Sequence, residues 1–171
     1  MKKIIFPLLL ISSFNACATH VDVGFSPEGS ARDVVIKAID SAQSSIHMMA
    51  YSFTAPDIMK ALAKAKDRGV DIKIVIDDKG NHGKASLAAM NYIVNHGIAL
   101  RTDSDFKIQH DKVMIIDGST VELGSFNYTA SAEHSNSENA MVIYDNKDVA
   151  NLYDQHWSDR WNRGKSYSSS Y

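Results

Sequence analysis

The stretch that decides the fold is residues 110–127, HDKVMIIDGSTVELGSFN. An Asp-Gly pair lies between its two apolar runs, a pattern typical of a β-hairpin. Along the first strand, alternation places His110 and Lys112 on one face, so that an imidazole and an ammonium project into the same space. The return strand brings Gly124 back near the start of the first strand. The hairpin is therefore predicted to gather polar groups that suit a phosphate.

The end of the hairpin extends this polar group. Ser125 and Asn127, two positions apart, add a hydroxyl and an amide without a charge that would neutralise the lysine. Gly124 lets backbone or ligand approach closely. Asp117 lies an odd number of residues from His110, so strand alternation sends it to the opposite face. We expect a structural role for Asp117, either in the turn or in a buried ion pair.

The chain around the hairpin alternates between strand and helix patterns. This alternation predicts an α/β fold in which helices flank a mixed, mostly parallel sheet, with right-handed crossovers. The hairpin adds antiparallel pairing to that sheet. Strands are predicted at residues 21–25, 45–53, 70–76, 98–101 and 138–144, helices at 26–42 or 30–42, 54–69, 84–95 and 147–161, polar loops at 77–83 and 128–136, and a loose Ser-rich tail at 164–171.

One histidine of the predicted strands has no ligand-spaced partner nearby in the sequence. His47 is therefore expected to be a core histidine with satisfied hydrogen bonds rather than a metal or substrate ligand.

The N-terminus has the pattern of a secretory signal. Two lysines, a short apolar run and the sequence Ala-Cys-Ala ending at residue 18 predict a signal peptide at residues 1–18 and a periplasmic mature chain at 19–171, of single-domain size. The apolar run is far shorter than the roughly 20 residues of a membrane span. Cys17 is the only cysteine, so the mature chain has no disulfide; lipidation of Cys17 is the alternative, although the residues before it match a lipoprotein signal weakly.

The net charge of the chain is −2, and loss of the signal lysines makes the mature part more acidic. Bulk charge therefore argues mildly against a nucleic-acid partner, although a local basic patch can coexist with an acidic total.

Taken as one string, the pattern HxKxxxxD that begins at His110, followed after six residues by GSxN, resembles the signature of the phospholipase D superfamily. A second HxK at His82 lacks both the aspartate and the GSxN, and is interpreted as coincidental. The resemblance covers the whole mature chain, which is most similar to the family's small bacterial endonucleases with one motif per chain. It implies a phospholipase D-like catalytic domain at residues 19–171, in which the aspartate and Gly124 are structural parts of the motif.

The resemblance also implies a mechanism without a metal or other cofactor. Larger members carry the motif twice, so a chain with one motif is expected to form a twofold homodimer with two His110 side chains across one phosphate. One His110 attacks phosphorus to give a phosphohistidine, and its mate is general acid and then general base. Lys112, Ser125 and Asn127 hold the non-bridging oxygens. Glu138, which matches a glutamate of the family, holds the proton on the other nitrogen of His110.

The expected substrate is DNA, single- or double-stranded, with RNA as a further candidate. Contacts to phosphate alone read no sequence, and Lys84, Arg101 and Lys107 would extend the path if they lie near the cleft. One alternative is the same chemistry on phospholipid headgroups; no basic amphipathic helix with an exposed Trp is evident, so no stable membrane association is expected. Two others are a metal-dependent nuclease using His110, Asn127 and His134, and a non-catalytic phosphate-binding module.

Overall fold

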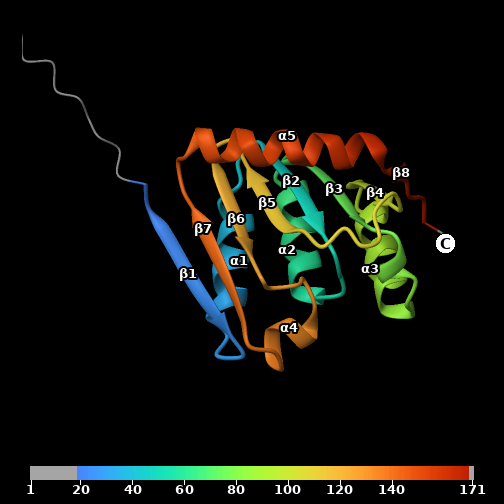
Figure 1. The fold of residues 1–171 in the computed structure, drawn as a ribbon, viewed down its shortest axis with the longest axis horizontal. Coiled ribbons are helices and arrows are strands. Elements are labelled where there is room, and N and C mark those ends of the chain that lie inside the picture. Colours follow the sequence, from blue (N-terminus) through green and yellow to red (C-terminus); the bar gives the residue numbers. More distant parts are fainter. Residues whose placement is uncertain (1–18, 170–171) are drawn as a thin grey trace, which may run out of the picture.

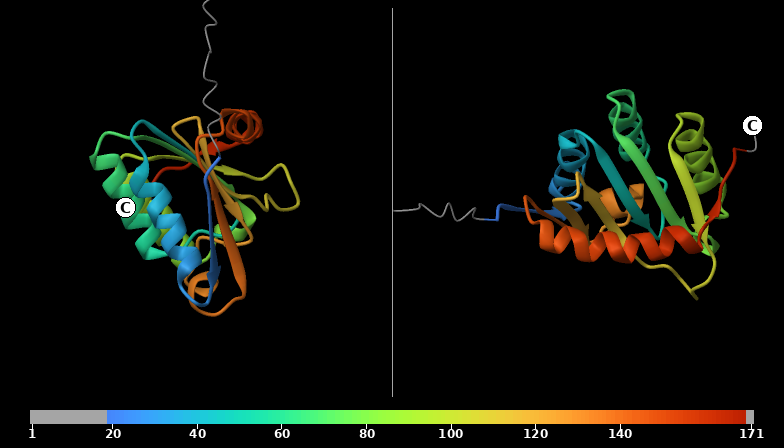
Figure 2. Two further views of the ribbon diagram at one scale, coloured as in Figure 1. Left: turned by 90° about the vertical axis from the view of Figure 1, so that its left-hand side faces the viewer. Right: turned by 90° about the horizontal axis from the view of Figure 1, so that it is seen from above.

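The structure, a computed structural model, describes residues 19–169, and the predicted signal peptide lies outside them. These residues form one open sheet of eight strands with helices on both faces (Figures 1 and 2). The strands are β1 (Val21–Ser26), β2 (Ser45–Ala50), β3 (Asp71–Asp77), β4 (Ala99–Asp103), β5 (Lys112–Ile116), β6 (Thr120–Gly124), β7 (Glu138–Ile143) and β8 (Lys165–Ser166). The helices are α1 (Ser30–Ser41), α2 (Pro56–Asp67), α3 (Lys84–Asn95), α4 (Ala130–His134) and α5 (Lys147–Arg163), with a 3₁₀ turn, η1 (Lys79–Asn81).

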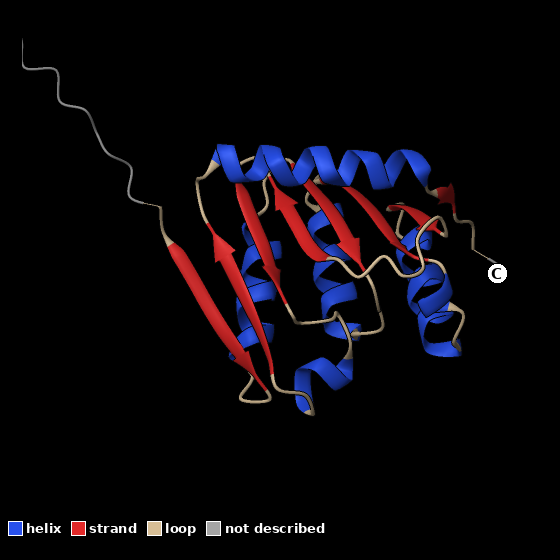
Figure 3. Ribbon diagram, viewed as in Figure 1, coloured by secondary structure: helices blue, strands red, loops and turns tan. Residues whose placement is uncertain are grey.

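The strand order is β1-β7-β6-β5-β2-β3-β4-β8 (Figure 3). The mixed α/β fold with flanking helices is confirmed, but parallel neighbours are fewer than predicted: β2 with β3 and β3 with β4. The other neighbouring pairs are antiparallel. The reason is that β5, β6 and β7 are inserted between β1 and β2, which separates strands that a helical crossover connects.

Two apolar layers hold the helices to the sheet. On one face the larger cluster joins the inner sides of α1, α2 and α3 to side chains such as Met48 and Met114. On the other face a smaller cluster joins α5 to Met49, Val113 and their neighbours. Because adjacent positions of β2 and β5 belong to opposite clusters, both faces of these central strands are buried, and their register is fixed from both sides.

Two segments expected to be irregular are ordered. The predicted loop at 128–136 contains α4, because the Thr129 hydroxyl accepts a hydrogen bond from the Ala132 N–H (3.1 Å) and caps this short helix. The predicted loose tail forms β8, because it pairs with the otherwise free edge of β4, and the Tyr167 N–H donates to the Leu100 carbonyl (2.9 Å).

His47 lies on β2, facing α5. Its Nδ1 is 2.6 Å from the Asp154 carboxylate, and its ring stacks on Trp157 with centroids 3.8 Å apart. The expectation of a hydrogen-bonded packing histidine is confirmed, although the side chain keeps 23 % of its exposure and lies at the margin of the core.

The most deeply buried acidic side chain of the described residues was not predicted from the sequence. Glu122, on β6, is fully buried, and one of its oxygens accepts a hydrogen bond from the Tyr128 hydroxyl (2.7 Å). Its other oxygen has no partner among the described residues. Burial raises the pKa of Glu122 to about 8, so this side chain is a neutral carboxylic acid at pH 7.

This raised pKa predicts that stability falls as the pH rises. The folded chain keeps the Glu122 proton up to about pH 8, whereas an unfolded chain releases it near the ordinary value of 4.5. Between those values the folded state binds more protons, so the free energy of unfolding should fall by at most about 1.4 kcal/mol per pH unit. Urea denaturation from pH 5 to 9 measures this slope. Glu122→Gln, which cannot ionise, should remove it, and equal slopes in the two proteins would contradict the assignment.

Candidate active site

The predicted site residues converge at one end of the strands, where β2, β3 and β6 end and β5 and β7 begin (Figure 1). Open α/β sheets commonly bind ligands at the carboxyl ends of their parallel strands, which here include β2 and β3. An open hollow of about 370 Å³ lies there. It is lined by His110, Lys112, Gly124, Ser125, Asn127 and Glu138. The structure therefore brings together six residues that are spread over 29 positions of the sequence.

His110 and Lys112 meet in a different way from the one expected. His110 precedes β5 and is exposed, whereas Lys112 is the first residue of the strand and is only 6 % exposed. Strand alternation therefore does not place the two side chains together. Instead, both contact the ring of Tyr51: the imidazole centroid is 4.7 Å from the ring centroid, and the Lys112 Nζ is 5.3 Å from it.

Lys112 supplies the positive charge of the hollow. Its Nζ donates to the His110 carbonyl (2.9 Å). Burial lowers the pKa of this ammonium, while the carboxylates of Asp111 and Glu138 partly oppose the shift. A cation that is poorly hydrated attracts an anion more strongly than one in bulk water, so this position favours binding of a phosphate.

Ser125 and Glu138, which also line the hollow, are joined by a hydrogen bond. The Ser125 hydroxyl donates to one Glu138 oxygen (2.6 Å) and accepts from the Asn139 N–H (3.0 Å). The other Glu138 oxygen accepts from the Asn136 amide (3.0 Å). Among the described residues no hydrogen bond joins Glu138 to His110, so the predicted proton acceptor for the imidazole stays a prediction. The same holds for Ser125 as a phosphate ligand, since its one proton is directed at Glu138.

Asn127 and Gly124 complete the hollow. The Asn127 Oδ1 is buried and has no partner among the described residues, which leaves the amide nitrogen as the atom that can donate to a ligand. Gly124 is required by the backbone: an added Cβ would lie 2.2 Å from the Asn139 carbonyl oxygen. The close approach expected at Gly124 is therefore made by the backbone of β7 rather than by a ligand.

Comparisons with known proteins agree with this geometry. Residues 35–161 match the family described as "Cardiolipin synthase, PLD-like domain". The crystal structure of Nuc, a phospholipase D family member from Salmonella typhimurium, is 65% identical with a TM-score of 0.88, over 89% of this chain and 100% of that one. A Rickettsia conorii protein named "Phospholipase D" is 32% identical over 162 residues, which are 93% of this chain and 80% of the relative. NucT from Helicobacter pylori, 22% identical with a TM-score of 0.74 over 88% of this chain and 100% of that one, shares the fold.

The chain belongs to the phospholipase D family. It is accordingly a phosphodiesterase of that superfamily. Within the family signature, the hollow contains the histidine and lysine of HxK and the glycine, serine and asparagine of GSxN.

The aspartate of the signature lies at the far end of β5, away from the hollow. Asp117 has a positive φ of 52° in the hairpin turn. Its carboxylate accepts hydrogen bonds from the backbone N–H groups of Gln43, Ser44 and Ser45 and from the Ser44 hydroxyl (2.8–2.9 Å). Burial opposes ionisation, but these hydrogen bonds outweigh it and lower the pKa of Asp117. Hydrogen bonds thus take the place of the expected ion pair, and the structural role of Asp117 stays a prediction.

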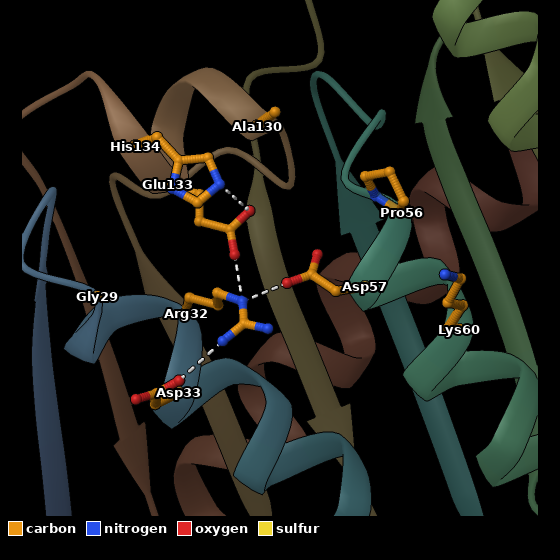
Figure 4. Close-up of a pocket in the computed structure, with 9 residues that line it drawn as sticks. All are labelled: Gly29, Arg32, Asp33, Pro56, Asp57, Lys60, Ala130, Glu133 and His134. Atoms are coloured by element: carbon orange, nitrogen blue, oxygen red, sulfur yellow. Dashed lines mark hydrogen bonds and ion pairs between the residues drawn. The ribbon is translucent and has the colours of Figure 1, made fainter.

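A second, larger hollow of about 580 Å³ is lined by residues of α1, α2 and α4 (Figure 4). There Arg32 of α1 pairs with Asp57 of α2 and with Glu133 of α4. Burial, followed by the neighbouring Asp57 carboxylate, raises the pKa of Glu133. The cluster fastens α4, the helix between Asn127 and Glu138, to the first two helices. His134 belongs to this hollow, 3.3 Å from Glu133, so the ligand set of the metal-dependent alternative is not assembled at His110.

The remaining basic candidates lie outside the hollow. His82 is exposed and pairs with Asp78 (3.3 Å), and Lys84 starts α3. Arg101 donates to the Trp161 carbonyl (2.7 Å) and lies over that ring. Lys107 is exposed on the loop that leads to His110, which is the position that suits the predicted phosphate path.

Sequence reasoning missed two residues that position this site. Tyr51 follows β2 directly, and Asp77 ends β3, with its carboxylate accepting from the Gln109 N–H (2.7 Å) beside His110. The available signal was their place at the carboxyl ends of two buried strands, where ligand sites form in such sheets.

Asp117→Asn should damage folding more than chemistry. An amide keeps one acceptor oxygen but turns an NH₂ group toward backbone donors, so we expect a loss of roughly 1–3 kcal/mol in the free energy of unfolding. The turnover number of the folded variant on a chromogenic phosphodiester should stay within a few-fold of wild type. Asp145→Asn is the matched control, because Asp145 also has a positive φ (53°) and asparagine tolerates that conformation. A stable Asp117→Asn protein without turnover would refute the structural role.

Proposed function

We propose that this phosphodiesterase is a metal-independent endonuclease that cleaves DNA without sequence specificity, through a phosphohistidine intermediate. The observation that carries the proposal is the convergence of an exposed imidazole, a buried ammonium and the Asn127 amide on one open hollow. These groups supply a nucleophile, a charge for the non-bridging oxygens and a neutral donor. RNA is a further candidate substrate, because the same contacts reach only phosphate.

The reaction we propose has two steps. A nitrogen of one His110 attacks phosphorus, the bond to the leaving oxygen breaks, and a second His110 protonates that oxygen. Water then attacks phosphorus and gives a proton to the second His110, and the P–N bond of the phosphohistidine breaks, which restores both side chains. Lys112 and Asn127 stabilise the charge of the phosphorane, and Glu138 accepts the N–H of the attacking imidazole. Protein side chains alone carry out these steps.

DNA suits the surroundings of the hollow better than a lipid. The loop that leads to His110 exposes Lys107, three residues before it in the chain, and a positive side chain on this loop can follow a phosphate backbone. Within residues 19–169 no helix is long and apolar enough to cross a membrane. Phospholipid is the second candidate, favoured by the name "Phospholipase D" of the Rickettsia conorii relative. The sequence of residues 1–18 supports periplasmic action.

Plasmid nicking tests the proposed reaction. The protein at low salt with EDTA should convert supercoiled plasmid to nicked and then degraded forms, and His110→Asn should be inactive. Because binding releases counterions, activity should fall steeply between about 50 and 200 mM salt. Phosphatidylcholine vesicles are the parallel substrate. Cleaved lipid with intact plasmid would overturn the DNA assignment, and activity restored only by Mg²⁺ would overturn the metal-free mechanism.

We also propose that the active enzyme is a twofold homodimer. One chain holds one His110, whereas in-line displacement needs an acid opposite the nucleophile. A candidate surface for the second copy lies on β1, the edge strand of the sheet (Figure 1). There Val21, Val23 and Phe25 of β1 are 42, 51 and 56 % exposed. Phe25 pairs with Asn139, which bonds Ser125, so this apolar patch continues to the site. A second copy of the chain would bury the patch and bring the two sites together.

Disruption of the patch should separate the protomers and abolish activity together. We expect Val23→Lys to sediment as a monomer and to lose plasmid nicking, with its melting temperature little changed. Leu87→Lys is the control, because Leu87 lies on α3, on the other side of the sheet, and is 39 % exposed. A wild-type protein that sediments as a monomer at concentrations where it nicks plasmid would refute the dimer.

A further inference from the structure

The geometry assigns Tyr51 as a positioning residue, a proposal that rests on the proposed cleavage at His110. We propose that the Tyr51 ring fixes the orientation of the His110 imidazole and the place of the Lys112 ammonium, and that its hydroxyl takes no part. The residue lies outside the family signature and does not line the hollow. It contacts His110 and Lys112, which do line the hollow.

The contacts of the ring carry this assignment. Tyr51 touches both members of the HxK pair, with the His110 centroid at 4.7 Å and an interplanar angle of 56°, and the Lys112 Nζ at 5.3 Å from the ring centroid. No hydrogen bond of the described residues holds the His110 ring nitrogens, so the contact with the Tyr51 ring is the interaction on which the proposed orientation of the imidazole rests. The Lys112 position also fits an ammonium held by the electron-rich face of an aromatic ring.

The ring is itself held firmly. The Tyr51 carbonyl accepts from the side-chain amide of Asn81 (2.6 Å), which is fully buried and also donates to the Asp77 carbonyl (2.7 Å). Gly80 packs directly against the ring: an added Cβ would lie 3.1 Å from Tyr51 Cε2. The turn η1 therefore fixes Tyr51 in both backbone and ring.

The same turn is tied to the His110 loop through one carboxylate. Asp77 is 1 % exposed, and one of its oxygens accepts from the Gly80 N–H (2.6 Å). The other accepts from the Gln109 N–H (2.7 Å), directly before His110. The Asp77 carboxylate thus binds both the turn that packs against the Tyr51 ring and the residue before His110. An arrangement of this kind holds a nucleophile within the narrow range that attack requires.

The test uses the full mature protein and bis-(p-nitrophenyl) phosphate in EDTA, a diester that does not depend on the natural substrate. Tyr51→Phe keeps the ring and should stay within about twofold of the wild-type kcat. Tyr51→Leu should lose kcat by roughly 10- to 100-fold while KM changes little, because a misplaced nucleophile impairs chemistry rather than binding. Tyr92→Leu is the matched control, since Tyr92 pairs with His96 (4.0 Å) on α3, and its kcat should not change.

A second variant keeps the test informative if Tyr51→Leu does not fold. Gly80→Ala places a Cβ 3.1 Å from both Tyr51 Cε2 and the Asp77 Oδ2, so it crowds the ring and the carboxylate without touching His110, and kcat should fall with an unchanged melting temperature. Where Tyr51→Leu folds, Gly80→Ala should cost less kcat in that background than in wild type, because only the Asp77 contact remains, whereas two independent losses of structure would add.

Three results would overturn the assignment: a wild-type kcat in Tyr51→Leu, an equal loss in Tyr51→Phe, or a change confined to KM. A wild-type protein that cleaves the chromogenic diester but not plasmid would instead refute only the DNA substrate. The failure of one proposal is therefore distinguishable from the failure of the other.

Discussion

The antiparallel pairing of β5 with β2 is the constraint on which the fold and the site both depend. It joins the strands that alternate with helices to the hairpin that carries the signature. The pairing runs from Ile46 with Ile116 to Ala50 with Lys112. Asp117 closes it at one end by binding the backbone before β2, and at the other end Tyr51 and His110 leave the sheet side by side. A slip of one residue would move Met114 and Val113 into each other's clusters, so packing on both faces holds the site in register.

Much of this arrangement was accessible from the sequence because its signals are local. The Asp-Gly turn, the period of the apolar residues and the single HxK with GSxN predicted the hairpin, the helices and six residues that line one hollow. The order of the strands in the sheet was harder to predict, since it depends on pairing between strands that are far apart in the sequence. The reason that His110 and Lys112 share the hollow was missed: alternation says which face a side chain takes only within a strand, and His110 lies before β5. Tyr51 and Asp77 make contacts with distant segments, which leave no periodic trace in the sequence.

Polar groups in costly positions surround the segment from Ser125 to Glu138. Glu122 holds the Tyr128 hydroxyl from within the core, and the Tyr128 carbonyl accepts from the N–H groups of Thr54 and Ala55 (2.8 and 3.0 Å). Arg32 holds α4 from outside (Figure 4). A buried acid or a shared cation adds little to stability when its desolvation is counted. Here such groups fix the short segment that joins Asn127 to Glu138, two residues of the proposed site. Electrostatic stabilisation of a transition state requires rigidity of this kind.

The strand order places the two ends of the described chain at opposite edges of the sheet, with β1 at one edge and β8 at the other (Figure 1). The seven steps from one edge strand to the other, at about 4.8 Å each, span roughly 34 Å. A covalent tandem of two such chains whose linker crosses one sheet therefore needs about ten extended residues at least. A tag fused after β8, by contrast, starts at the edge of the sheet that is farther from β5, β6 and β7, the strands whose ends form the hollow.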